Sequence, residues 1–219
     1  MQQATAVAAR ALAGGALQPI RTHEATVTDR GLPFRVRVVD SLARKAAARR
    51  EPQARPNPFL PYDPALFVAE LSGRYVVLLN KYPVIEGHLL IVTRNFEEQE
   101  TSLSGEDFAA LCHCLAQMDG LGFYNAGLAA GASQRHKHLQ LVPQPALGEL
   151  PLEPEIRAAL EIGALATALP FRHALAPLDP NWLDDPAAAG PRLAQIYERL
   201  LAVVGRGGDR GYGGYNLLI

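Results

Sequence analysis

Two short, uninterrupted apolar runs constrain the fold of this chain more than any other feature. They are residues 75–80 (YVVLLN) and residues 88–93 (HLLIVT). Runs of this length are typical of buried strands, and Pro83 and Gly87 between them favour a turn. A connection this short joins strands that run antiparallel. The sequence therefore predicts an antiparallel strand pair at the centre of the fold.

Helices and further strands surround this pair. Residues 23–40 alternate apolar and polar side chains around a turn at 29–31 and predict a hairpin, and residues 104–118 predict a helix that Ser104 caps. More strands are expected at 136–142, 171–176 and 215–219, and more helices at 1–17 (apolar face Val7, Leu12, Ala16 and Leu17), 41–50, 153–168 and 186–204. Few strand–helix–strand crossovers are present, which favours an α+β fold: a mainly antiparallel sheet with helices packed on it.

Length and composition limit the class of protein. The 219 residues suffice for one sizeable core, so we expect a single domain over residues 1–219 with an irregular proline-rich segment at 51–64. A net charge of −1 argues against a general nucleic-acid binder, and no run of 18 apolar residues predicts a membrane span. Two cysteines are too few for a disulfide framework. We expect a soluble cytoplasmic protein, either a monomer or a weak dimer.

The segment GASQRHKHLQLVP at residues 131–143 carries the candidate chemistry. If it forms a strand, its period of two places His136, His138 and Gln140 on one face. That face is a solvent-exposed surface, a metal site or a nucleophilic site, and Gln140 is a poor third ligand for zinc. The preceding turn, with backbone N–H groups and the Ser133 hydroxyl, suits an anion. A histidine that faces a bound phosphate suggests nucleophilic attack on phosphorus.

Several motifs along the chain together resemble one known family. They are NPFLPY at 57–62, NKYPVIEGHLLIVT at 80–93, FEEQ at 96–99, FYNAGLAAGASQRHKHLQ at 123–140 and YNLLI at 215–219. On these motifs the chain, from about residue 15 onward, is similar to the histidine-triad (HIT-like) superfamily, in its diadenosine tetraphosphate phosphorylase (ATP adenylyltransferase) branch. A lone His-x-His is a weak signal, whereas this combination is specific.

The resemblance implies roles for individual residues. His138 is the nucleophile, which forms an adenylyl-histidine, and His136 orients it or holds its active tautomer. Gln140 stands where hydrolytic members have a third histidine, and it favours phosphate over water as the acceptor. The substrate contacts are expected from Asn80, Lys81, Asn125, Gly131, Ser133, Gln134 and Lys137. Lys137 lies on the opposite strand face, where it either curls round to a distal phosphate or is structural.

The resemblance also implies a reaction and its partners. The expected reaction is phosphorolysis of diadenosine tetraphosphate to ATP and ADP, with the nucleotides and phosphate as the partners. No metal ligand and no covalent cofactor are expected, although Mg²⁺ accompanies the polyphosphate. His88 resembles the Gly-His turn of the superfamily and is expected to make a structural hydrogen bond. The family usually continues past YNLLI into a segment with a tryptophan and a Val-Pro-Arg, so we expect that C-terminal segment to be missing.

Two other functions stay open from the sequence. The first is a hexose-phosphate uridylyltransferase-like enzyme, which also uses a His-x-His-x-Gln nucleophile. That family typically has proline between the histidines, where this chain has Lys137. The second is a catalytically incomplete nucleotide-binding remnant, which the missing segment favours. A comparison of adenosine with uridine nucleotides separates the first, and activity before and after His138→Ala addresses the second.

Overall fold

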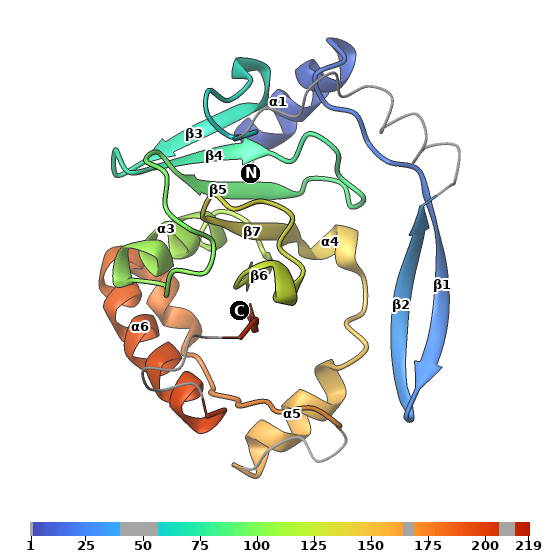
Figure 1. The fold of residues 1–219 in the computed structure, drawn as a ribbon, viewed down its shortest axis with the longest axis vertical. Coiled ribbons are helices and arrows are strands. Elements are labelled where there is room, and N and C mark those ends of the chain that lie inside the picture. The colour runs from blue at the N-terminus through green and yellow to red at the C-terminus, as the bar shows by residue number, and fades with distance from the viewer. Residues whose placement is uncertain (1, 40–56, 164–168, 206–212) are drawn as a thin grey trace.

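A six-stranded antiparallel sheet forms the centre of the protein (Figure 1). The computed structural model describes residues 2–39, 57–163, 169–205 and 213–219. The strands lie in the order β3-β4-β5-β7-β6-β8. Their bounds are β3 Phe67–Leu71, β4 Tyr75–Leu79, β5 Leu89–Thr93, β6 Gly120–Asn125, β7 His138–Pro143 and β8 Asn216–Leu218. The predicted central pair is confirmed: β4 and β5 are neighbours, and every residue of both is buried.

Helices α1 (Gln2–Ala13), α3 (Gly105–Leu115) and α6 (Pro186–Val203) pack on one face of this sheet. Ser104 caps α3 as predicted, in a capping box that it forms with Asp107. Helices α3 and α6 approach closely at Gly190, where a Cβ atom would lie 2.2 Å from the Gly105 carbonyl oxygen. Only glycine therefore fits this crossing of α3 and α6.

The opposite face of the sheet carries a smaller apolar cluster. Its buried members come from β4, β5 and the proline-rich segment: Phe59, Val76, Leu78, Leu90 and Val92. Residues 57–63 form no strand and lead into the short 3-10 helix η1 (Pro64–Leu66), which agrees with the irregular structure predicted there. The described part of the proline-rich segment, residues 57–64, thus lies on the sheet and covers part of this face, whereas residues 51–56 lie outside the described residues.

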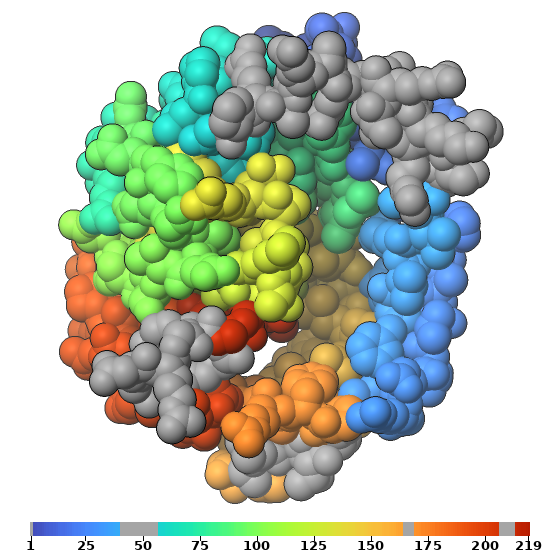
Figure 2. All heavy atoms as spheres, viewed as in Figure 1, coloured from blue at the N-terminus to red at the C-terminus, as the bar shows by residue number. Residues whose placement is uncertain are grey.

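A separate two-stranded hairpin lies across an opening from the main sheet (Figures 1 and 2). It consists of β1 (Thr22–Asp29) and β2 (Leu32–Val39), as predicted, and Arg30 and Gly31 both have positive φ in its two-residue turn. Leu32 at its tip packs in a small cluster with Ala159 and Leu169. Ala159 belongs to α5 (Glu153–Glu161), which follows the short α4 (Gln144–Leu147).

The structure corrects several predicted elements. Residues 171–176 form no strand; the segment instead packs Leu175 against the Leu32 cluster. The first helix ends at Ala13, and Leu12 is exposed instead of buried. The predicted helix at 41–50 lies outside the described residues, whereas YNLLI forms β8 as predicted. Within the described part of the chain, no helix combines the length and apolar character that crossing a bilayer requires.

Two short 3-10 helices complete the described elements. They are η2 (Leu128–Ala130) in the loop between β6 and β7, and η3 (Pro180–Asp184) before α6. The loop with η2 contains the predicted anion-binding turn and leads directly to β7. Its position ties the turn at 131–133 to the strand that carries His138.

Candidate active site

His138 lies at the start of β7, and two neighbours hold its backbone and its ring. Gln99 Oε1 accepts from His138 N–H at 2.8 Å, and Gln99 Nε2 donates to the His138 carbonyl at 3.1 Å. The ring Nδ1 lies 2.8 Å from the His136 carbonyl oxygen. A carbonyl only accepts, so Nδ1 carries the hydrogen and Nε2 keeps its lone pair. Burial lowers the pKa of His138, which keeps this ring neutral. Nε2 is thus an unprotonated nitrogen in a fixed ring.

The ring of His136 is held separately and does not contact that of His138 through a hydrogen bond. Its Nε2 donates to the Thr93 carbonyl at 2.8 Å, and its Nδ1 accepts from Asn57 Nδ2 at 2.9 Å. Asn57 is oriented in turn, because its Oδ1 accepts from Phe59 N–H at 3.0 Å. The expected tautomer of His138 is therefore held by the backbone carbonyl of His136, and the imidazole of His136 is not involved. The predicted strand also begins later than expected, since β7 starts at His138.

Phe59 covers both histidines from the proline-rich segment. Its ring centroid lies 5.0 Å from that of His138 and 5.9 Å from that of His136. Phe59 is 8% exposed and belongs to the apolar cluster on this face of the sheet. The two imidazoles are consequently removed from water on one side, which explains why burial is the main cause of the lowered pKa of each.

Gln140, two residues after His138, is the next residue on the same face of β7. In the register of β5 and β7, His138 is opposite Val92 and Gln140 is opposite Leu90. Gln140 Oε1 is 3.0 Å from His88 Nε2, and His88 Nδ1 is 3.1 Å from Asn80 Nδ2. The structural hydrogen bond predicted for His88 is thus present. Asn80 also accepts from Tyr82 N–H, so both ends of its amide contact the protein, where a contact with a remote phosphate was expected.

The other predicted substrate contacts lie at the end of β6, in the loop before β7, and between β4 and β5. Asn125 ends β6 close to His138, because Gln99 Nε2 donates to both the Asn125 and the His138 carbonyls. Asn216 of β8 donates to Asn125 Oδ1 at 2.8 Å, which fixes the Asn125 amide. Gly131 has a φ of 91°, and the loop continues through an exposed Ser133 and a half-buried Gln134 to β7. Lys81 is exposed between β4 and β5, and its Nζ lies over the Tyr82 ring.

The side chain of Lys137 lies in a buried ion pair. Its side chain is 1% exposed, and its Nζ is 2.8 Å from Asp107 Oδ2 and 3.4 Å from Glu97 Oε2. Burial acts to raise the pKa of Asp107, but the Lys137 charge and the hydrogen bonds from Lys137 and Ser104 outweigh it and hold that pKa below its usual value. Of the two alternatives left open for Lys137, a distal phosphate or a structural role, the geometry favours the structural one, because the lysine is part of a buried ion pair beneath the strand.

Sequence reasoning missed the residues that hold the site from a distance. Gln99, Asn57, Phe59 and Asn216 had no assigned role. All four lie in the motifs FEEQ, NPFLPY and YNLLI, and that placement was the one signal available. Their contacts with the histidine strand span 39 and 79 positions for Gln99 and Asn57, so no local pattern reveals them.

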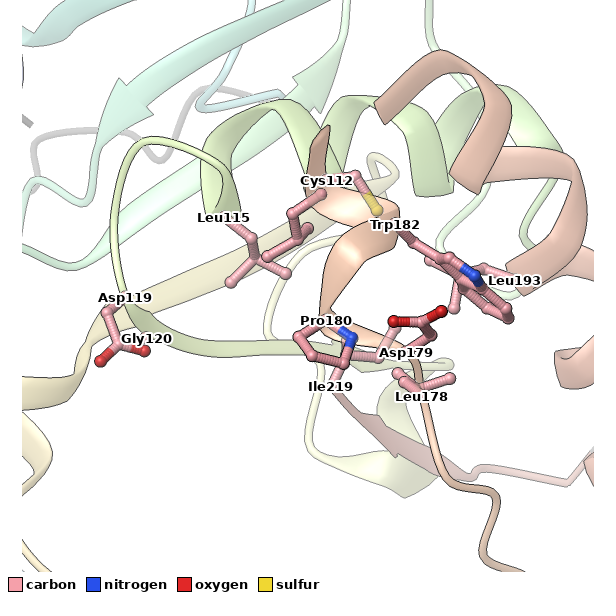
Figure 3. Close-up of a pocket in the computed structure, with 11 residues that line it drawn as sticks. Cys112, Leu115, Asp119, Gly120, Leu178, Asp179, Pro180, Trp182, Leu193 and Ile219 are labelled. Carbon is pink, nitrogen blue, oxygen red and sulfur yellow. The ribbon is translucent and has the colours of Figure 1, made fainter. Parts of the chain in front are cut away.

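A separate cavity lies on the helix-covered side of the sheet (Figure 3). Its volume is about 270 Å³, and its lining is mostly apolar, with Cys112, Leu115, Trp182 and Ile219 among its residues. Burial raises the pKa of Cys112 to about 11, so its thiol stays protonated at neutral pH. None of the predicted site residues lines this cavity. In the described residues, no three His, Cys, Asp or Glu side chains group as a metal site would require.

Known proteins with similar sequences include two from Saccharomyces cerevisiae. The chain is 36% identical over 120 residues to diadenosine 5′,5′′′-P1,P4-tetraphosphate phosphorylase 2, a match that covers 48% of this chain and 37% of that protein. It is 30% identical over 144 residues to Protein APA1, which covers 60% of this chain and 45% of that protein. The matches therefore span less than half the length of these relatives.

Solved structures share the fold over the whole chain. Yeast Ap4A (diadenosine tetraphosphate) phosphorylase Apa2 in complex with AMP has a TM-score of 0.77 and 24% identity, covering 100% of this chain and 75% of that one. The same protein in complex with Ap4A has a TM-score of 0.68 and 22% identity, covering 100% and 76%. These likenesses establish the predicted HIT-like α+β fold. The family profile described as "Ap4A phosphorylase N-terminal domain" matches residues 1–158. On that match, the chain belongs to the Ap4A phosphorylase N-terminal domain family.

Proposed function

We propose that this chain catalyses the phosphorolysis of diadenosine tetraphosphate to ATP and ADP. The observation that carries the proposal is the state of His138, a neutral ring whose Nδ1–H is bound to the His136 carbonyl and whose Nε2 keeps its lone pair. Such a nitrogen can attack phosphorus without a separate base. The choice of diadenosine tetraphosphate as the substrate rests on the family and on the name of the yeast relative.

The proposed reaction has two displacements at the same α-phosphorus. In the first, His138 Nε2 bonds to phosphorus, the bond to the bridging oxygen breaks, and ATP leaves. In the second, a phosphate oxygen bonds to phosphorus and the N–P bond breaks. The electron pair of that bond returns to Nε2 of His138, and ADP leaves. Neutral imidazole is regenerated, so no further reactant is needed. Mg²⁺ enters this proposal only as part of the polyphosphate substrate.

Donors around His138 suit the charge on the phosphoryl oxygens. We assign this role to the amide of Gln140, the loop from Gly131 to Gln134 and the amide of Asn125. Fixed donors that need no reorientation stabilise a charged transition state more than mobile water does. The hydrogen bonds from Gln99 and Asn216 support the proposal, because they limit the motion of His138 and Asn125.

Product analysis tests the proposal. Wild-type protein, His138→Gly and His113→Gln are incubated with diadenosine tetraphosphate and phosphate, and the nucleotides are separated by anion exchange. His113 is exposed on α3, so its variant is a matched control. We expect equal amounts of ATP and ADP from the wild type and the control, and none from His138→Gly. Activity that survives in His138→Gly contradicts the proposal.

A further inference from the structure

The amide of Asn80 has only one orientation that its neighbours allow. Tyr82 N–H donates, so the Asn80 atom that lies 3.1 Å from it is the oxygen Oδ1. The amide nitrogen Nδ2 then faces His88 Nδ1, also at 3.1 Å. Since Nδ2 is a donor and accepts nothing, His88 Nδ1 must accept. One backbone N–H thus decides which nitrogen of His88 is unprotonated.

The same logic continues to Gln140. A neutral imidazole whose Nδ1 accepts carries its hydrogen on Nε2. His88 Nε2 therefore donates across 3.0 Å, and the Gln140 atom that receives this bond is the oxygen Oε1. The amide nitrogen of Gln140, which is the donor end, is left for a ligand in front of β7. A chain of three hydrogen bonds fixes the polarity of a residue beside the nucleophile.

This series of hydrogen bonds requires His88 to be neutral, and the surroundings of His88 keep it neutral. His88 is 8% exposed, and the Phe123 ring lies 5.9 Å from it. Burial lowers the pKa of His88 to about 4. The hydrogen bond to Gln140 opposes this shift, whereas the charged form of His138, the titratable group that faces it, adds to it. A doubly protonated ring would point a second donor at Asn80 Nδ2, which cannot accept.

We propose that Asn80 and His88 are positioning residues that hold the donor end of Gln140 toward the acceptor and so favour phosphate over water. The inference rests on the proposed function. A phosphate oxygen accepts hydrogen bonds and is attracted to the amide N–H groups, but it is repelled by an amide oxygen. With the amide reversed, Oε1 would instead accept from a water molecule and orient it for hydrolysis. The network thus controls which acceptor receives the adenylyl group.

Two substitutions should reverse or release the amide. In Asn80→Asp, a carboxylate accepts from His88 Nδ1, so a neutral His88 has an accepting Nε2 and Gln140 must turn its nitrogen toward it. In His88→Phe, the link is removed. In His88→Gln, one amide supplies both a donor and an acceptor, which preserves the polarity. Gln2→Glu, an exposed amide-to-carboxylate change in the first turn of α1, controls for added charge.

The ratio of ADP to AMP formed from diadenosine tetraphosphate in phosphate buffer measures the choice of acceptor. At mildly alkaline pH we expect this ratio to fall about tenfold in Asn80→Asp and His88→Phe, the effect of one hydrogen bond to a charged group. His88→Gln and Gln2→Glu should stay near the wild-type ratio. An active wild type whose ratio is unchanged in Asn80→Asp and His88→Phe overturns this inference alone. A wild type that forms no ADP overturns the proposed function.

A second measurement does not depend on activity or on a variant that folds. The ¹⁵N resonances of the imidazole nitrogens in wild-type protein report which nitrogen of His88 carries the hydrogen. We expect the Nε2–H tautomer at neutral pH. An Nδ1–H tautomer overturns the inference, because it requires the reversed amide on Gln140.

Discussion

At the scale of single residues, hydrogen-bond polarity determines what each histidine can do. His138 donates from Nδ1 and keeps Nε2 free of hydrogen, whereas His136 and His88 both donate from Nε2. The partner that decides the tautomer is a carbonyl for His138 and His136, and an oriented amide for His88. The three imidazoles therefore take two tautomers, with hydrogen on Nδ1 in His138 and on Nε2 in His136 and His88. Of these three rings, only that of His138 keeps Nε2 free of hydrogen, and this is the nitrogen that the proposed mechanism uses.

The burial of His88 makes a prediction about stability and pH. Its pKa is about 4 in the folded protein and 6.5 in the reference state, so the unfolded chain binds a proton that the folded chain does not. Proton uptake by the unfolded chain therefore lowers the free energy of unfolding. The full free energy is present above pH 6.5, and up to about 3 kcal/mol of it is lost as the pH falls toward 4. We expect the free energy of unfolding of the wild type to fall more steeply over this range than that of His88→Gln. Urea titrations at several pH values check this, and parallel curves would contradict it.

At the scale of elements, β7 separates two kinds of chemistry. One face of the strand carries His138 and Gln140 beside the proline-rich segment. Beneath the strand, Lys137 pairs with Asp107, which also accepts from the Tyr75 hydroxyl and is the N3 residue of the capping box of α3. The ion pair joins the histidine strand to the helix layer. The lysine between the two histidines therefore has a structural role in this chain.

Removal of Lys137 tests that role. Lys137→Met leaves Asp107 fully buried without its cation, which should cost about 3–5 kcal/mol of unfolding free energy. The double variant Lys137→Met/Asp107→Asn should recover part of the loss, because no uncompensated charge stays buried. Arg157→Met removes an exposed pair with Glu153 and should change stability by less than about 1 kcal/mol. Urea denaturation measures all three, and a Lys137→Met loss as small as that of Arg157→Met would contradict the account.

The strands that carry the site were predictable from the sequence because their apolar pattern is local. β4 and β5 are buried at every position, and the first four residues of β7 alternate polar and apolar side chains. Residues 171–176 had a similar pattern but formed no strand, since a strand also needs a partner that no local pattern specifies. The period of two predicted the face of the strand on which Lys137 lies. It did not predict that Lys137 pairs with the buried Asp107. The hydrogen bonds of Gln99 and Asn57 depend on tertiary packing and could not be predicted.

At the scale of the whole molecule, two parts differ in how well they are packed. The main sheet has a large core against α1, α3 and α6. The β1–β2 hairpin has one buried residue, Leu32, and lies on the far side of the opening in Figure 2. Val27, Phe34, Val36 and Val38 on the hairpin are each more than a third exposed. A hairpin with few buried contacts opens more readily than a sheet core.

Hydrogen exchange checks this difference. We expect the backbone amides of β1 and β2 to exchange much faster than those of β4, β5 and β7, because the hairpin can open without disturbing the main core. The measurement is exchange followed by mass spectrometry on peptides from both regions of the full chain. Equal protection of the hairpin and the central strands would show that the two parts open together.

The proposed mechanism requires His138 Nε2 to take up the adenylyl group. The most direct measurement is the intact mass of the protein after incubation with diadenosine tetraphosphate in the absence of phosphate, compared with His138→Gly. We predict that the wild type gains the mass of one adenylyl group, that His138→Gly does not, and that added phosphate releases the group as ADP. A wild type that forms ATP and ADP with phosphate but never shows this adduct, or an adduct that persists in His138→Gly, would contradict the account.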